Sequence, residues 1–348
     1  MATPKVTVLM SVHNGAKYLG EAIDSIVKQT FTDFEFLIID DGSTDNSVGI
    51  VQAYGDPRIC LIHNDGNLGL AASLNRGFEL ARGELIARMD ADDISRPERL
   101  AYQVRFMDEN PLVGVCGSWV RFFPTADNSI WKLPESSEEI RCLQFHTVGV
   151  AHPSVMVRKG FFAEHGLSYD PRFRFSQDYE LWGRAIRYMK FANIQKVLLD
   201  YRISPGQICA RYGSEQLAAV APLRLQRVRE LGIEPTSSEQ ELHEMVLNNS
   251  MPHESKYLDL AERWLLRLDS ANRAAGTYPP EYFSRRILDI WFSICLSLAD
   301  ASVCSCRRCV TSPLWTAADT SPWQRLRALA AWVVRRGVWE TIWGPRHV

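Results

Sequence analysis

The sequence contains few cysteines, no long apolar run and little net charge. Eight cysteines in 348 residues are too few for a disulfide-stabilised scaffold. No apolar signal core precedes the first strand-like segment, so we expect a reduced, cytoplasmic protein. Because no stretch of about 18 apolar residues occurs, we also expect no membrane-spanning helix. The hydrophobic fraction of 46% is typical of a globular protein with a sizeable core.

Two phosphate-binding motifs are also missing. No G-x-G-x-x-G follows the first strand-like segment, which argues against a dinucleotide-dependent dehydrogenase. No G-x-x-x-x-G-K-[ST] occurs either, which argues against a P-loop nucleotidase.

The formal net charge of −2 argues against a nucleic-acid-binding protein, but it conceals an uneven distribution. Residues 301–348 carry seven arginines against two acidic residues, so this tail has a net charge of +5 and the rest of the chain −7. Within 321–348, apolar residues recur at helical spacing. We hypothesise that this segment lies on the anionic inner face of the membrane, which would make the protein peripheral there. Docking onto the protein's own helical region is the alternative.

The first 110 residues alternate between short apolar segments and amphipathic segments. Strands are predicted where β-branched and other apolar residues cluster, at 6–11, 34–39, 59–62 and 84–89. Helices are predicted where apolar residues recur every three or four positions, at 19–27, 46–54, 70–82 and 94–109. This alternation predicts an α/β fold in which helices flank a mostly parallel sheet.

The pattern changes twice along the remaining chain. Residues 111–205 mix strand-like segments with two predicted helices, and beyond 205 only helical segments remain. We therefore expect a domain at 1–205, divided into halves at 1–110 and 111–205. A helical domain at 206–300 and a basic amphipathic tail at 301–348 follow it.

Polar side chains follow each of the first four predicted strands. They are Asn14; Asp40 and Asp41; Asn64 and Asn67; and Asp90, Asp92 and Asp93. In a parallel sheet the carboxyl ends of the strands meet at one edge, where ligands bind. The sequence therefore predicts one acidic, asparagine-rich site at that edge.

The sharpest of these clusters is Asp90-Ala91-Asp92-Asp93. Carboxylates concentrated at a strand end repel one another unless hydrogen-bond donors or a hard cation balance them. Mg²⁺ or Mn²⁺ together with a substrate diphosphate suits one or two such ligands. Capping of the following helix is the alternative, although capping needs only one aspartate.

Two other aspartates have both a structural and a functional interpretation. Asp41, in Asp40-Asp41-Gly42-Ser43, is typical of an Asx-type turn, or it grips a nucleoside as part of the strand-end site. Asp178 opens a predicted helix and could cap it. A carboxylate at such a position, facing a cleft, can equally act as a general base, with Trp182 offering a flat apolar face for a ring.

Taken in order, six of these segments resemble glycosyltransferase family 2. The segments are Val8–Gly15, Ile39–Asp45, Asn67–Gly69, Asp90–Asp93, His152–Ser154 and Gln177–Trp182. The resemblance covers about residues 5–205. It implies an inverting sugar transferase with a GT-A fold, in which a Rossmann-like nucleotide-binding half adjoins an acceptor half.

The resemblance also implies a role for each matched residue. Asp41 corresponds to the carboxylate that reads the nucleobase, usually uracil, and Asp90 to the first aspartate of the D-x-D element, beside the ribose and phosphates. Asp92 corresponds to its ligand for Mg²⁺ or Mn²⁺, and Asp178 to the catalytic base. The expected nucleotide-binding set is completed by matched residues at the strand ends: Ser11, Asn14 and Asn67.

The chain departs from the family's pattern at two positions. His13 stands where a tyrosine is usual, and Gln177 stands where a glutamate precedes the base. Because the base itself is retained, we expect activity to survive both changes.

The expected reaction is the transfer of one sugar from a nucleoside diphosphate sugar to an acceptor hydroxyl. Asp178 would take the hydroxyl proton, while a cation on Asp92 would stabilise the leaving diphosphate. For Arg202 a charge near the phosphates and a structural salt bridge are both open, and His152 is assigned to the core or to an acceptor loop.

The expected partners are a sugar-nucleotide donor, in particular a UDP-sugar, and a glycan or lipid-linked acceptor of polysaccharide or lipopolysaccharide assembly. The Q-x-x-R-W element of the family's processive synthases is absent, which favours one sugar per event. The alternatives are a sugar-1-phosphate nucleotidyltransferase and an inactive module that binds sugar nucleotides or glycans.

Overall fold

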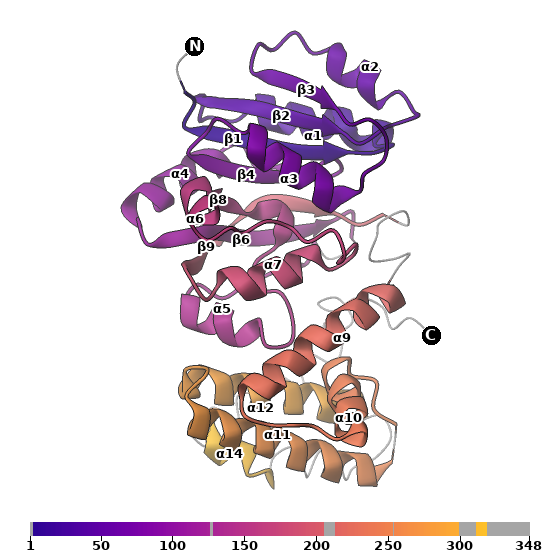
Figure 1. The fold of residues 1–348 in the computed structure, drawn as a ribbon, viewed down its shortest axis with the longest axis vertical. Helices are drawn as coiled ribbons and strands as arrows, with labels where there is room; N and C mark the ends of the chain where they lie inside the picture. The colour runs from indigo at the N-terminus through magenta and orange to yellow at the C-terminus, as the bar shows by residue number, and fades with distance from the viewer. Residues whose placement is uncertain (1–2, 126–127, 205–212, 253, 299–310, 319–348) are drawn as a thin grey trace. The chain divides into compact units, whose positions relative to one another are not determined.

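The computed structural model describes residues 3–125, 128–204, 213–252, 254–298 and 311–318 (Figure 1). By its internal contacts the chain forms two compact units. The first consists of Met1–Ile140 and Val148–Ala219, and the second of Arg141–Thr147 and Val220–Val348. The predicted tail helix at 321–348 lies outside the described residues.

The first unit is built on one mixed sheet with the strand order β3-β2-β1-β4-β8-β6-β9-β5, and β7 pairs with β6. The strands are β1 Val6–Val12, β2 Phe34–Asp40, β3 Ile59–His63, β4 Leu85–Asp90, β5 Ile94–Ser95, β6 Val113–Phe123, β7 Ile130–Trp131, β8 Met156–Arg158 and β9 Lys190–Arg202. The pairs among β1 to β4 are all parallel, which confirms the predicted sheet there. Beyond β4 the sheet is mixed, because β8 runs antiparallel to both β4 and β6.

Helices surround this sheet (Figure 1). They are α1 Ala16–Val27, α2 Ser47–Gln52, α3 Leu70–Leu80, α4 Arg99–Glu109, α5 Ser137–Leu143, the short η1 His152–Ser154, α6 Lys159–Glu164 and α7 Gln177–Ala185. The α9 helix, Gly213–Glu230, runs from the first unit into the second.

Strands β1 and β2 are apolar along their whole length because both faces of the sheet are covered. Leu9 and Leu37 pack in one cluster with Leu74 of α3 and Trp182 of α7. Val8 and Phe36, which alternate with them along the strands, are also fully buried. A strand buried on both faces reads as a continuous apolar run, which explains why the sequence located these strands well.

One predicted helix begins later than its apolar pattern suggested. Residues Ile94–Ser95 pair with β9 as the short strand β5, and α4 starts only at Arg99. Pro97 in the intervening turn fits this break, because a proline disfavours helical geometry at the residue before it.

The strand register brings the predicted site together at the carboxyl ends of β1, β2 and β4. Ser11 lies opposite both Ile39 and Asp90, and Val12 lies opposite Asp40. The loops that follow these three strands therefore start at the same edge of the sheet, as the sequence predicted.

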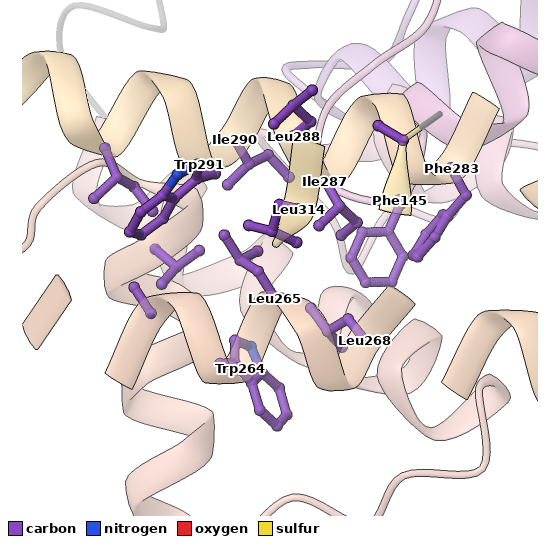
Figure 2. Packing of buried hydrophobic residues seen from close by; sticks show 14 of the residues in the cluster. Phe145, Trp264, Leu265, Leu268, Phe283, Ile287, Leu288, Ile290, Trp291 and Leu314 are labelled. Atoms are coloured by element: carbon purple, nitrogen blue, oxygen red, sulfur yellow. The ribbon is translucent and has the colours of Figure 1, made fainter. Parts of the chain in front are cut away.

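The second unit is helical, as predicted for the C-terminal region. Besides α9 it contains α10 Ser237–Leu247, α11 Ser255–Ala275, α12 Pro280–Leu298 and α14 Leu314–Ala317. Its core joins Leu265 of α11 and Ile287 of α12 with Phe145, which comes from the short segment 141–147 (Figure 2). Within the described residues, no helix is both long enough and apolar enough to cross a bilayer.

Candidate active site

Asp41 is a buried carboxylate that organises the loop after β3. One of its oxygens accepts hydrogen bonds from the Asn64 side chain at 2.8 Å and from the Leu68 backbone N–H at 2.9 Å. The other accepts the Gly69 N–H at 2.9 Å. Burial alone would raise the pKa of Asp41, but these donors outweigh it and the pKa is lowered. Asp41 is therefore held as an anion.

The loop after β1 is tied to the loop after β2 through Asn14. Its side-chain oxygen accepts the backbone N–H groups of Thr44 and Asp45, at 2.8 and 3.2 Å. Asn14 itself has a left-handed backbone, with φ of 52°. Beside it, His13 Nδ1 donates to the backbone carbonyl of Asp41 at 2.9 Å. Because a carbonyl can only accept, Nδ1 carries a proton, and this bond holds His13 beside Asp41.

Asp90 closes β4 and forms a two-pronged ion pair with Arg88. Arg88 Nη1 lies 2.6 Å from Asp90 Oδ2, and Nη2 donates to Oδ1. Residues two apart on a strand face the same side of the sheet, so this pairing follows from strand geometry. The Arg88 side chain is almost completely buried, whereas Asp90 is partly exposed.

Asp92 and Asp93 complete the acidic cluster. One carboxylate oxygen from each of Asp90, Asp92 and Asp93 lies within 4.8 Å of the others. Burial and the charge of Asp90 raise the pKa of Asp92 to about 6 and that of Asp93 well above its usual range. In the described structure Asp93 Oδ2 is buried without a hydrogen-bond partner. Repelling carboxylates with an unpartnered buried oxygen fit a divalent cation.

Arg202, at the end of β9, shapes the backbone of this cluster. Its backbone N–H donates to Asp93 Oδ1 at 2.8 Å, and its Nε donates to the carbonyl of Asp92 at 2.6 Å. The guanidinium also pairs with Glu21 at 2.8 Å and lies over the Tyr18 ring. The structure thus contains a salt bridge of Arg202, and a charge near the phosphates stays a prediction.

Asp178 lies in the first turn of α7 and accepts the N–H of the next residue, Tyr179, at 2.8 Å. The residue preceding the helix is Ser176, and its side chain forms no capping bond. Burial raises the pKa of Asp178, and the charge of Asp90 adds to this, while the Tyr179 N–H and Arg88 oppose it. The charges of Asp90 and Arg88 therefore act on Asp178 in opposite directions.

His152 and Trp182 lie behind this site. The Nε2 atom of His152 lies 2.8 Å from the Tyr169 hydroxyl, and burial together with the Arg88 charge lowers the pKa of His152 well below its usual range. A neutral, buried imidazole agrees with the expected core role. Trp182 is fully buried, edge-on to His152 and Tyr169. No face of the Trp182 ring is exposed to an acceptor sugar, because the ring fills the core beneath α7.

The structure gathers most of the predicted residues but not all of them equally. Ser11 lies beside Asp90 in the sheet, whereas Asn67 is exposed at the tip of the loop that Asp41 holds. The sequence analysis missed Arg88 and Tyr169. A signal for Arg88 existed, since a charged residue inside the apolar segment 84–89 needs a buried partner.

Comparisons with known proteins point to one family. The sequence model of "Glycosyl transferase family 2" matches residues 7–166. An uncharacterized glycosyltransferase of Methanocaldococcus jannaschii is 39% identical over 211 residues, which cover 58% of this chain and 72% of the relative. The putative glycosyltransferase EpsE of Bacillus subtilis is 32% identical over 208 residues, covering 57% and 73%.

Solved structures show the same fold at lower identity. Staphylococcus aureus TarS, residues 1–349, is 18% identical with a TM-score of 0.55, covering 90% of each chain. The mannosyltransferase PcManGT of Pyrobaculum calidifontis is 16% identical with a TM-score of 0.52, covering 98% of this chain and 89% of its own. The GT-A fold expected from the sequence is thereby confirmed. With relatives above 30% identity over more than two thirds of their length, the chain belongs to glycosyltransferase family 2.

Proposed function

We propose that this glycosyltransferase moves a single sugar from a UDP-sugar to an acceptor hydroxyl, with inversion at the anomeric carbon. The observation that carries the proposal is the juxtaposition around Arg88. Arg88 is paired with Asp90 of the D-x-D element, and its charge also acts on the pKa of Asp178. An inverting transfer needs one base and one stabilised leaving group, and these two groups supply both parts.

The Asp41 carboxylate supports a uracil nucleotide. Donors from Asn64, Leu68 and Gly69, together with a hydrogen bond from the Ser73 side chain, fix its position and its charge. The N3–H of uracil is a donor of the kind that such a fixed anion accepts. Among the structural neighbours, TarS has been solved with UDP and with UDP-GlcNAc, whereas PcManGT has been solved with GDP-Man and Mn²⁺.

The D-x-D cluster supports a divalent cation. Asp92 would hold Mg²⁺ or Mn²⁺, with Asp93 within reach, while Arg88 already occupies both oxygens of Asp90. When bound, such a cation neutralises negative charge on a diphosphate leaving group. In the protein alone, burial and the charge of Asp90 raise the pKa values of Asp92 and Asp93, a penalty on the charged forms that a cation would offset.

Asp178 is the proposed general base. Its position in the first turn of α7 places the carboxylate at the positive end of the helix dipole, which favours the ionised form. Burial works in the opposite direction and makes the carboxylate a better proton acceptor than an exposed aspartate. The acceptor hydroxyl would donate its proton to this oxygen as it attacks the anomeric carbon.

The acceptor is proposed from family membership alone. A glycan or lipid-linked acceptor of surface polysaccharide or lipopolysaccharide assembly fits a family 2 enzyme without the Q-x-x-R-W element. Location at the inner face of the membrane through 321–348 stays a prediction from the sequence.

The experiment that tests the proposal is nucleotide release by the full chain. UDP-, GDP- and dTDP-sugars are supplied with Mn²⁺ and a panel of sugar and glycolipid acceptors. We expect release of UDP above the buffer rate, and a loss of about 10²-fold or more for Asp178→Asn, as for removal of a general base.

Asp108→Asn is the matched control, since Asp108 is half exposed on α4 and pairs with Lys5. This variant should release UDP like the wild type. Equal release by wild type and Asp178→Asn would refute the assignment of the base. Release from no donor would favour an inactive, sugar-nucleotide-binding module.

A further inference from the structure

Arg88 is a buried arginine in the middle of the proposed donor site. Only 4% of its side chain is exposed, and it lies on β4 two residues before Asp90. Both terminal nitrogens donate to Asp90, one to each carboxylate oxygen. A two-pronged ion pair of this kind fixes the plane of the carboxylate as well as its position, which a single hydrogen bond does not.

The charge of Arg88 reaches the rest of the site. It opposes the rise that burial causes in the pKa values of Asp92, Asp93 and Asp178, and together with burial it disfavours protonation of His152. The other arginine at the cluster, Arg202, is paired with Glu21 and bound to backbone groups of the loop. Arg99 and Arg202 also act on carboxylates of the cluster, but Arg88 is the arginine whose charge is seen to act on both the D-x-D carboxylates and Asp178.

The geometry also limits what Arg88 can do. Each of its terminal nitrogens donates one N–H to Asp90, and with only 4% of the side chain exposed it presents little surface to a phosphate in this structure. Its Nε is buried without a hydrogen-bond partner in the described structure. Any influence of Arg88 on the donor should therefore pass through Asp90, the partly exposed member of the pair.

We propose that Arg88 is a positioning residue that holds the Asp90 carboxylate in the orientation needed to bind the nucleotide of the donor. The proposal rests on the proposed function, which places the ribose and phosphates beside Asp90. It assigns binding to Asp90 itself and orientation to Arg88. Loss of the arginine should consequently remove most of what Asp90 contributes.

A double-mutant cycle on nucleotide binding tests this assignment. The full chain is titrated with UDP in the presence of Mn²⁺ by calorimetry, for wild type, Arg88→Met, Asp90→Asn and the double variant. We expect each single substitution to weaken UDP binding about tenfold, the size of one lost charge-assisted interaction. The double variant should bind no more weakly than Asp90→Asn, because both changes remove the same interaction.

Two further variants separate positioning from folding. Arg88→Lys retains the charge but cannot donate to both oxygens of Asp90 at once as the guanidinium does. The UDP affinity of this variant should therefore lie between those of wild type and Arg88→Met. Arg82→Met is the matched control, because Arg82 forms an ion pair with Glu35 in the same unit, away from the D-x-D element. Its UDP affinity should equal that of the wild type. Melting temperatures show which variants are folded, and Arg88→Lys carries the test if Arg88→Met is not.

The outcomes distinguish this proposal from the proposed function. If Asp90→Asn weakens UDP binding while Arg88→Met and Arg88→Lys bind like the wild type, Arg88 is not a positioning residue, and the donor site stands. If the losses of the two single variants multiply in the double variant, Arg88 acts independently of Asp90, and the proposal is overturned. If the wild type does not bind UDP, the proposed function fails, and this proposal fails with it.

Discussion

At the scale of single residues, the site depends on how each buried carboxylate is balanced. Asp41 and Asp93 are almost equally buried, with 3% and 1% of their surface exposed. Asp41 receives three N–H donors and its pKa is lowered, whereas Asp93 faces Asp90 and Asp92 and its pKa is raised. An aspartate carboxylate is therefore stabilised as an anion at Asp41, whereas its charged form is destabilised at Asp93. Asp41 thus serves to hold the loop after β3, whereas the charge of Asp93 would be stabilised by a bound cation.

Asp93→Asn should raise the melting temperature of the metal-free protein. A carboxyl whose pKa is higher in the folded state than in the unfolded chain stabilises the fold only at low pH, and stability is lost as the pH rises through the native pKa. Asparagine removes this cost and can still accept the Arg202 N–H. Each kcal/mol gained corresponds to about 2–4 °C for a unit of this size.

Thermal melts in EDTA at pH 5 and pH 8 check this prediction, and the gain should be larger at pH 8. Mn²⁺ should then stabilise the wild type more than the variant, because the variant lacks one carboxylate of the cluster. A wild type whose melting temperature does not respond to Mn²⁺ would count against the metal site.

The pH dependence of turnover should reflect the raised pKa of Asp178. The base works only when ionised, so a raised pKa moves the acid limb of the rate profile above the value of about 3.9 that is usual for aspartate. UDP release is measured between pH 4 and 9 with saturating Mn²⁺ and donor. A limb at or below the usual value would show that Asp178 is not the titrating base.

The sequence predicted which residues are candidates for chemistry better than it predicted which side chains they pair with. Asp41, Asp90, Asp92 and Asp178 stand in motifs, so they could be singled out without a structure. The pairing of Arg88 with Asp90 could not, because it depends on which side chains β4 buries. Trp182 stands in a motif too, but its role could not be predicted from it. A tryptophan at such a position is equally suited to contact a ligand and to fill the core.

At the scale of elements, the nucleotide edge is formed by two loops that touch through glycine. Gly42, after β2, has a φ of 72°, and a Cβ there would lie 2.7 Å from the backbone carbon of Gly66. The loop at 64–69 in turn supplies two backbone donors to Asp41. The close approach at Gly42 therefore lets the loop at 64–69 bring its backbone donors to Asp41.

Gly42→Ala should disturb the hydrogen bonds that the loop at 64–69 makes to Asp41. The alanine would be strained at a positive φ, and its Cβ would push the loop away from Asp41. We expect a loss of stability of about 1–3 kcal/mol, as for overpacking elsewhere, together with weaker UDP binding. Denaturant unfolding and UDP calorimetry measure the two effects.

Gly55→Ala is the matched control, because a Cβ at Gly55 would meet no atom within 4 Å. That variant should unfold and bind UDP like the wild type. If Gly42→Ala matched Gly55→Ala in stability and in UDP affinity, the contact with Gly66 would not be what holds the loop at 64–69 against Asp41.

The elements themselves were predictable where burial is simple. Strands β1, β2 and β4 are buried on both faces, so their apolar runs located them closely. The start of α4 was not, because Ile94–Ser95 pairs with β9 more than a hundred residues later in the chain. The spacing of apolar residues within a segment does not show a strand partner that lies far away in the sequence. Within the segment itself, Pro97 indicated that the helix begins later.

At the scale of the whole molecule, the two units are interleaved along the chain. Residues 141–147 fall between two parts of the first unit but belong to the second. Phe145 anchors this segment: it is fully buried, and its ring lies edge-on to those of Tyr278, His243 and Phe283. Hydrophobic periodicity cannot show this exchange, since an apolar residue after α5 is compatible with either core.

Phe145→Ala should destabilise the second unit selectively. Truncating a fully buried phenylalanine costs about 3–5 kcal/mol in the core that loses it, here the helical cluster of Figure 2. Differential scanning calorimetry with and without UDP and Mn²⁺ separates the units, because ligand binding shifts only the transition of the unit that binds. The transition that UDP does not shift should move to a lower temperature in the variant.

Tyr188→Ala, at an exposed aromatic of the first unit, is the control and should leave both transitions in place. If Phe145→Ala lowered only the UDP-sensitive transition, the segment 141–147 would belong energetically to the nucleotide-binding unit instead.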